Sequence, residues 1–243
     1  MTSVPKPSAT FTCALLAAAL LFSQAGFGQD DDDFFVFDEE ETQAPSIADP
    51  LEGFNRAMFG VNDVLYRGIL KPVARGLRIL PVPVRNGGRN FFNNLGAPIS
   101  AGSALLQGDL HNTLTEAGRF VINSTAGILG LFDPATGMGI ARDEEDLGQT
   151  MARWGVGHGF YLVLPFLGAS SLRDTIGNIA TNRLNPVYEE LDSDEIVAIN
   201  IISGEISLSL DQDTYEGLYE NALDPYIFFR SAWVQNRAGR VAE

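Results

Sequence analysis

Few side chains in this sequence have the type and spacing that bond-breaking chemistry requires. The two histidines, His111 and His158, lie too far apart for an HExxH motif or a His-rich metal site, so we interpret each as a surface or packing residue. Ser170 or Ser171 could be combined with His158 and Asp174, but a catalytic triad is recognised by geometry and not by nearness in sequence. The residues therefore predict no metal, no cofactor and no enzyme activity.

Two further features that often carry chemistry are weak here. Gly155, Gly157 and Gly159 resemble half of a phosphate-binding loop, but no predicted strand precedes them and no Gly-Lys-Ser/Thr follows, which favours a flexible turn. Cys13 is the single cysteine. A single cysteine excludes an intramolecular disulfide and a Cys-based zinc site.

Charge is unevenly distributed along the chain. The 243 residues hold 31 acids and 16 Lys or Arg, a net charge of −15, which disfavours a nucleic-acid partner. Residues 53–89 carry seven bases and one acid, whereas residues 189–224 carry eleven acids and no base. A dipolar domain is expected.

Four of the bases follow a helical spacing. Arg67, Lys71, Arg75 and Arg78 are separated by 4, 4 and 3 residues, so they form one cationic stripe if Pro72 only kinks the helix. Such a stripe could face lipid headgroups or a channel mouth, where each cation contributes about 1 kcal/mol near an anionic surface. The alternative is a solvated face that pairs with the acidic segment, and both remain open.

Capping residues and apolar periodicity predict helices along most of the domain. We expect a helix from Phe54 that Pro72 ends or restarts, and one capped by Asp109 that carries Leu110, Leu114, Ala117 and Val121 on one face. We also expect one capped by Asp143 and stopped by Gly155, one that starts at Ser170 or Ser171, runs through Ala180 and is ended by Asn185-Pro186, and one from Pro225 to Arg237 that Asp224 caps and Gly239 ends. Residues 195–210 show both helical spacing and strand-like alternation, and we favour a helix. No convincing strands are found, so the fold class is all-α with a single domain.

The N-terminus has the order of a secretory signal. Lys6 precedes an apolar run over residues 14–22 and then small residues, so we expect a signal peptide over 1–28 that is cleaved after Ala25 or Gly28. Cys13 precedes the apolar run, so we expect a mature chain without an acyl group. Residues 29–48 then form an acidic flexible linker. The later apolar segments 121–132 and 160–169 are interrupted by polar residues, Gly or Pro, and predict no spanning helix.

Several motifs in register carry a family resemblance. They include DPLEGFNR at 49–56, NFFNNL at 90–95, LQGD at 106–109, RFVINSTAGILGLFD at 119–133, LGQT at 147–150, GHGFYLVLPFLG at 157–168, LRD at 172–174 and DPYIFFR at 224–230. Together they resemble the MlaA (VacJ) family over residues 49–238, which leaves 239–243 as a C-terminal tail. The motif residues to which we assign no role are Asp49, Pro50, Phe54, Asn55, Arg56, Gln107, Gly108, Asp109, Gln149, Arg173, Asp174, Asp224, Pro225 and Tyr226.

The resemblance implies a fold and a function. It implies an all-helical ring- or disc-like domain with a central amphipathic channel, seated in the inner, periplasmic leaflet of the bacterial outer membrane. Such a protein removes mislocalised phospholipid from the outer leaflet, associates with a trimeric porin and passes the lipid to a soluble periplasmic carrier. Members are usually lipoproteins, and the position of Cys13 departs from that pattern.

Lipid transfer needs an apolar path and no nucleophile, because moving a two-chain lipid through water exposes about 30 methylenes at about 0.8 kcal/mol each. The Gly-rich segments 121–132 and 160–169 are our candidates for the channel wall, since glycine permits close or movable packing. The residues concerned are Gly127, Gly130, Gly159 and Gly168. The alternatives are that these segments are ordinary core, that the protein is a structural outer-membrane or periplasmic partner, or that it is a lipid-degrading enzyme.

Overall fold

The computed structural model describes residues 46–165, 167–188, 190–211 and 213–242. The expected signal peptide, Cys13 and nearly all of the expected linker lie outside the described residues. The helices are α2 (Glu52–Leu65), α3 (Lys71–Leu77), α4 (Val82–Gln107), α5 (Leu110–Thr125), α6 (Pro134–Gly137), α7 (Leu147–Arg153), α8 (Leu172–Leu184), α9 (Ser193–Leu210), α10 (Thr214–Asn221) and α11 (Pro225–Ala242). Residues 195–210 are therefore helical, and the all-α prediction is confirmed.

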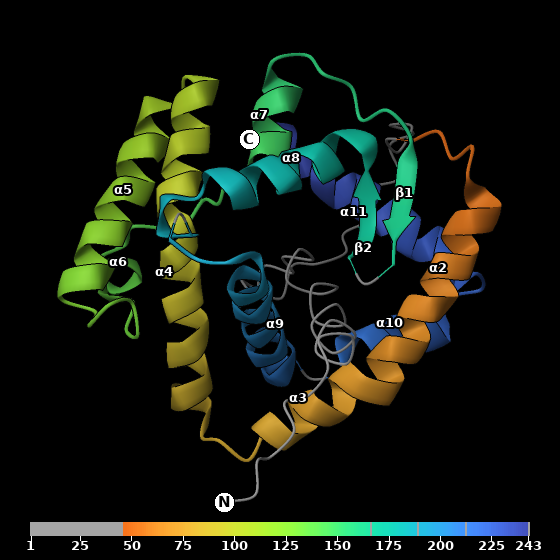
Figure 1. The fold of residues 1–243 in the computed structure, drawn as a ribbon, viewed down its shortest axis with the longest axis horizontal. Helices are drawn as coiled ribbons and strands as arrows, with labels where there is room; N and C mark the ends of the chain where they lie inside the picture. The colour runs from red at the N-terminus through yellow and green to blue at the C-terminus, as the bar shows by residue number, and fades with distance from the viewer. Residues whose placement is uncertain (1–45, 166, 189, 212, 243) are drawn as a thin grey trace, which may run out of the picture.

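The elements follow one another around a closed circuit (Figure 1). Helix α3 packs on α9, α9 on α4, α4 on α7, and α7 on α8. A two-stranded sheet then joins α8 back to α2, and α5 packs outside α4. This circuit gives the domain the ring-like outline that the sequence predicted.

The sheet is the part of the fold that the sequence did not predict. Strands β1 (Tyr161–Leu164) and β2 (Gly168–Ser171) form an antiparallel hairpin with Leu164 opposite Gly168. Ala48 adds an isolated parallel bridge to Phe160. Most of the apolar segment 160–169 is thus strand, because its β-branched and aromatic residues can alternate between the two faces of a sheet.

Pro72 lies in the first turn of α3, where the α-helix restarts as predicted, and the helical path before it is continuous. A π-helical turn, Tyr66–Leu70, leads directly into α3, and the Lys71 amide donates to the Tyr66 carbonyl. A proline has no N–H to continue the α-helical bonding, and a π turn places the break before it. The four bases of the stripe therefore lie on one continuous helical path.

Local capping signals located most of the helix starts. Asp109, Ser171 and Asp224 accept hydrogen bonds from the backbone amides three residues on, as N-caps do. Asp143 is not a cap, because α7 begins only at Leu147 and Asp146 accepts from the Gln149 amide at 2.8 Å as its N-cap. The Asp143 amide donates to Glu116 Oε1 at 3.0 Å.

The predicted helix ends were less accurate. Gly155 follows α7 with φ of +85°, as a stop residue should. Helix α8 ends at Leu184, immediately before Asn185-Pro186, as predicted. However, α11 continues through Gly239 to Ala242. The helix stop predicted at Gly239 is therefore wrong.

The buried apolar clusters are small for a chain of this size. One surrounds Tyr66 and Leu70, against which Ile201 and Leu208 of α9 pack. The other surrounds Tyr161, Val163 and Tyr226, where the hairpin meets α2 and α11. Much of the remaining interior is polar.

Candidate functional site

Helix α5 is inverted relative to a helix of a water-soluble protein. The face that the sequence identified as apolar, Leu110, Leu114, Ala117 and Val121, is exposed, with Leu114 73% accessible. The opposite face, which packs toward α4, consists of Asn112, Glu116, Arg119 and Asn123, all buried. An amphipathic helix whose apolar face is outside and whose polar face is inside suits an apolar surrounding medium.

Helix α8 shows the same inversion. Its exposed residues Leu172, Ile176 and Ile179 are spaced by 4 and 3, whereas Arg173 and Asp174 are buried. The loop after α5 extends the apolar surface with four further exposed side chains, Ile128, Leu129, Leu131 and Phe132. Exposed apolar residues therefore form faces on elements from different parts of the chain, which is rarely seen in soluble monomers.

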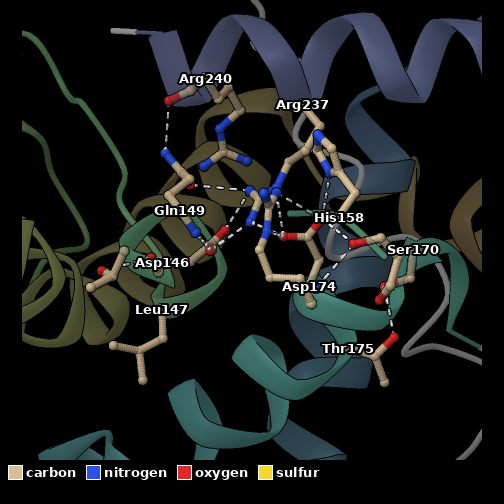
Figure 2. A network of polar contacts seen from close by, with 12 residues as sticks. Asp146, Leu147, Gln149, His158, Ser170, Asp174, Thr175, Arg237 and Arg240 are labelled. Atoms are coloured by element: carbon tan, nitrogen blue, oxygen red, sulfur yellow. Dashed lines mark hydrogen bonds and ion pairs between the residues drawn. The ribbon is translucent and has the colours of Figure 1, made fainter. Parts of the chain in front are cut away.

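A buried ion-pair network joins the inverted helix α8 to α7 and α11 (Figure 2). Arg237 of α11 donates to Asp146 at 2.7 Å, at the start of α7, and to Asp174 of α8 at 2.9 Å. Gln149 Oε1 accepts a further bond from Arg237, and Ser171 donates to Asp174 at 2.7 Å. One guanidinium thus links three helices.

The electrostatics of this network keep its members charged. Burial alone would raise the pKa of Asp174, but the Arg237 guanidinium holds it below its usual range. Burial would also raise the pKa of Asp146, but Arg237 holds it below its usual value. For His158, burial and then the nearby Arg173 lower the pKa, although the Asp174 carboxylate opposes them. The imidazole is therefore neutral at neutral pH.

These residues do not form a catalytic triad. Ser171 is buried and donates directly to Asp174, while His158 Nδ1 lies 3.9 Å from the same carboxylate. A triad needs the histidine between the serine and the acid. Among the described residues there is also no group of three or more His, Cys, Asp or Glu that could hold a metal ion.

A second polar network joins the start of the domain to α11. Asn55, which is fully buried, donates to Asp49 at 2.7 Å and to the Tyr161 carbonyl at 3.1 Å. Tyr226 and Arg230 also donate to Asp49. Burial raises the pKa of Asp49, but these donors together keep it below its usual value. This carboxylate therefore fixes α2, the hairpin and α11 relative to one another.

Comparison with known proteins identifies the family. The family model described as MlaA lipoprotein matches residues 47–240. The chain belongs to the MlaA lipoprotein family. It is 39% identical to the Intermembrane phospholipid transport system lipoprotein MlaA of Shigella flexneri, over 80% of this chain and 78% of the relative. An uncharacterized protein of Rickettsia bellii is 35% identical over 91% of this chain and 88% of the relative.

The fold is also shared with a solved structure of the family. That chain was solved in a study of the structural basis for maintenance of bacterial outer membrane lipid asymmetry. The two share a TM-score of 0.73 and 37% sequence identity, over 80% of this chain and 99% of the other. Within the part of our chain that the structure describes, no helix is both long and apolar enough to cross a bilayer.

The MlaA motif residues are distributed over several polar joints of the ring. Asp49, Asn55 and Tyr226 belong to the second network, and Gln149, Arg173 and Asp174 to the first. Arg56 pairs with Asp224 at 2.9 Å, and its guanidinium lies 4.5 Å from the centre of the Tyr226 ring. These contacts show the motif residues joining elements together.

The other motif residues occupy helix ends and one exposed position. Gln107 donates to Glu145 at 2.6 Å, Gly108 ends α4 with φ of +83°, and Asp109 caps α5. Pro50 and Phe54 lie at the start of α2, where Phe54 is 47% exposed, and Pro225 is the first residue of α11.

Two of the four residues of the cationic stripe pair with the acidic segment. Lys71 pairs with Glu216 and with Asp213, and Arg78 lies 3.4 Å from Asp213. Arg67 pairs with Asp63 at 2.8 Å. The structure thus shows the internal pairing that the sequence left open as the alternative. Contact of the stripe with lipid headgroups remains a prediction, and the exposed Arg75 is the stripe residue best placed for it.

The four glycines expected to form a channel wall lie at close approaches or positive φ. A Cβ on Gly127 would lie 2.3 Å from the Phe132 carbonyl oxygen, and one on Gly130 would lie 2.5 Å from Asn94 Cβ. Gly159 and Gly168 have φ of +73° and +74° at the two ends of the hairpin segment. Their positions explain the need for glycine through tight turns and packing, while a moving wall remains a prediction.

Sequence reasoning missed Gly148, Gly177 and Arg237. A Cβ on Gly177 would lie 2.5 Å from the Gly148 backbone nitrogen, so both glycines let α7 and α8 approach closely enough for Arg237 to reach two carboxylates. Two glycines on helices that lack other breakers were a signal of close packing.

We expect Gly130→Ala to destabilise the protein. Gly130 has φ of +88°, where an alanine costs about 1–2 kcal/mol, and overpacking against Asn94 adds to that cost. Thermal unfolding followed by circular dichroism measures the effect. Gly96→Ala is the matched control, because no atom would lie within 4 Å of its Cβ inside α4, and it should be neutral or stabilising by up to about 1 kcal/mol. Equal melting temperatures for the two variants would contradict this account of Gly130.

Proposed function

We propose that this protein transports phospholipid between membranes and maintains lipid asymmetry of a bacterial outer membrane. In this function it removes mislocalised phospholipid from the outer leaflet and passes it to a soluble periplasmic carrier. The proposal is supported by the family, in which relatives are named as lipoproteins of an intermembrane phospholipid transport system. The observation that carries it is the inversion of α5 and α8, whose apolar faces are exposed and whose polar faces are buried.

The inversion has a physical consequence for location. Exposed Leu110, Leu114 and Val121 would each lose about 1.5–3 kcal/mol of burial free energy in water, whereas lipid acyl chains cover them without that cost. We propose that the protein is seated in the inner leaflet of the outer membrane, with these faces against lipid. Association with a trimeric porin is part of the same proposal and rests on the family resemblance alone.

A phospholipid needs a path that shields its acyl chains and accepts its headgroup. The ring-like circuit of elements, with apolar faces outside and polar networks inside, supports a central amphipathic channel as that path. Passage of a lipid requires no nucleophile, metal or general base. We therefore propose a transport protein without enzyme activity.

We expect Leu110→Asp with Leu114→Asp to weaken membrane binding by at least about 100-fold. Two Leu side chains that leave lipid lose at least about 3 kcal/mol together, which corresponds to that factor. Flotation with vesicles of phosphatidylethanolamine and phosphatidylglycerol measures the binding. Leu110→Met with Leu114→Met is the control, because it keeps both side chains apolar. Unchanged flotation of the folded Asp variant would contradict lipid contact at α5.

Transport itself is tested in cells that lack their own copy of the protein. Full-length protein should prevent accumulation of phospholipid in the outer leaflet and restore resistance to detergent, and phospholipid should co-purify with it. Restoration without bound or transferred phospholipid would favour the structural-partner alternative. Release of fatty acid or headgroup by the purified protein would show a lipid-degrading enzyme.

A further inference from the structure

The buried polar faces of α4 and α5 enclose a small cavity. Its lining includes Asn90, Asn93 and Asn94 from α4, and Glu116 and Arg119 from α5. The volume is about 20 Å³, and one water needs about 10–15 Å³ on the same measure. The cavity therefore has room for one water-sized molecule and not for a lipid headgroup.

One buried acceptor at this cavity lacks a partner. Asn94 is 6% exposed, and its amide nitrogen donates to Ser124 Oγ at 2.9 Å, but within the described residues its Oδ1 has no hydrogen bond. Gly130 packs against Cβ and Cγ of Asn94 and limits how the side chain can move away. Leaving a buried acceptor unsatisfied costs about 1–3 kcal/mol, so a donor is expected next to it.

A second acceptor lines the same space. Glu116 is 1% exposed, and its Oε1 accepts from the Asp143 amide at 3.0 Å. Burial raises the pKa of Glu116, although that bond and the nearby Arg142 and Arg119 oppose the shift. The carboxyl group can therefore accept a further hydrogen bond from a molecule in the cavity, or donate one when it is protonated.

The chemistry of the lining selects the ligand. Asn90 and Asn93 add amide donors to the acceptors on Asn94 and Glu116, so the molecule must both donate and accept. A phosphate only accepts and would face the Glu116 carboxyl. An ammonium group only donates, and Arg119 and Arg142 disfavour a further cation. The Asp133 carboxylate also lines the cavity, but its oxygens already accept from Arg119 and Asn123. Water satisfies both demands and fits the volume.

We infer that this cavity is a binding site for one ordered water, which bridges Asn94 and Glu116 and completes the polar interface between α4 and α5. The water would fill a gap between the polar faces of α4 and α5. In a soluble helical protein, apolar side chains fill such an interface. It is separate from the ion-pair networks at the other joints of the ring and does not depend on the proposed transport function.

A crystal structure of the full chain in detergent, at a resolution that shows waters, tests the inference. We expect one density peak within hydrogen-bond distance of Asn94 Oδ1 and the Glu116 carboxyl, and its loss in Asn94→Leu. An empty cavity would overturn the inference. A peak with several short contacts at metal–oxygen distances would also overturn it, in favour of an ion.

A double-mutant cycle provides a test that does not need the leucine variant to fold. Asn94→Ala and Glu116→Ala should shift the melting temperature non-additively, by about 2–4 °C, because each removes one partner of the same bridge. The control cycle pairs Asn94→Ala with Glu205→Gln on α9, whose side chain does not line the cavity, and should be additive. Additive shifts for Asn94 and Glu116 would overturn the bridging role.

Discussion

Replacement of Arg237 by methionine should lower the free energy of unfolding by about 3–5 kcal/mol, the largest effect we expect from a single substitution. Arg237 is 6% exposed and is the shared partner of Asp146 and Asp174. Removing one member of a buried ion-pair network leaves the other charges uncompensated, which costs about that amount. Denaturant unfolding in detergent, followed by circular dichroism, measures the change.

Arg240→Met on the same helix is the matched control. Arg240 donates to the Glu144 carbonyl at 2.8 Å in an exposed bond, so its loss should cost less than about 1 kcal/mol. Arg237→Lys should lie between the two, because lysine keeps the charge but cannot reach both carboxylates with a fork of donors. If Arg237→Met were no less stable than Arg240→Met, the network would not hold α7, α8 and α11 together.

The second large effect concerns Glu205, a buried carboxyl on α9. Glu205 is 7% exposed, and within the described residues its Oε2 has no hydrogen-bond partner. Burial raises the pKa of Glu205 to about 7, from an ordinary value of 4.5. Between these two values the folded protein binds a proton that the unfolded chain has released, so stability falls as the pH rises from about 4.5 to 7 and is flat above.

We expect Glu205→Gln to be more stable than the wild type at pH 8, by about 3 kcal/mol, and equally stable near pH 4.5. The reason is that glutamine has the same shape and cannot ionise. Unfolding free energies across pH 4.5 to 8 provide the measurement. Glu220→Gln, at an exposed glutamate of α10, is the control and should keep the wild-type profile. If the unfolding free energies of Glu205→Gln and the wild type changed in parallel with pH, the expected effect would be contradicted. The Glu205 carboxylate would then have a stabilising partner when it ionises.

Helix starts could be predicted because their signals are local. Asp109, Ser171 and Asp224 each cap the helix that follows through a bond to an amide three residues away. Asp143 failed as a cap because the chain enters α7 only at Leu147, after a non-helical segment in which the Asp143 amide bonds to the distant Glu116 carboxylate. Tertiary contacts of this kind leave no trace in the neighbouring sequence.

The direction in which an amphipathic helix faces could not be predicted. The spacing of Leu110, Leu114, Ala117 and Val121 identified one face of α5 correctly, but periodicity does not say whether protein, water or lipid covers that face. The sequence also contained the polar residues of the opposite face of α5. Asn112, Glu116, Arg119 and Asn123 repeat at 4, 3 and 4 residues, and the two sets together describe a helix that can be packed either way.

The candidate site was only partly predictable, because a sequence identifies residues but not the distant residues that they contact. The motif residues were identified, but their partners lie far away in sequence, as for Asp49 with Tyr226 and Arg230. The four bases of the cationic stripe lie along one helical path, and Lys71 and Arg78 pair with acids of the 189–224 segment. A charged helix face can contact lipid headgroups or pair with acids of another segment. The sequence does not decide between these, because the fold determines which segments meet.

The account rests most directly on lipid contact at the outward face of α5, and site-directed spin labelling tests it. Single cysteines at positions 112, 114 and 121, in a Cys13→Ser background, are labelled in protein reconstituted into phospholipid bilayers. Labels at 114 and 121 should show high accessibility to oxygen and low accessibility to a water-soluble nickel chelate, while the label at the buried position 112 should be inaccessible to both. High accessibility of 114 and 121 to the nickel chelate would place this face in water and contradict the account.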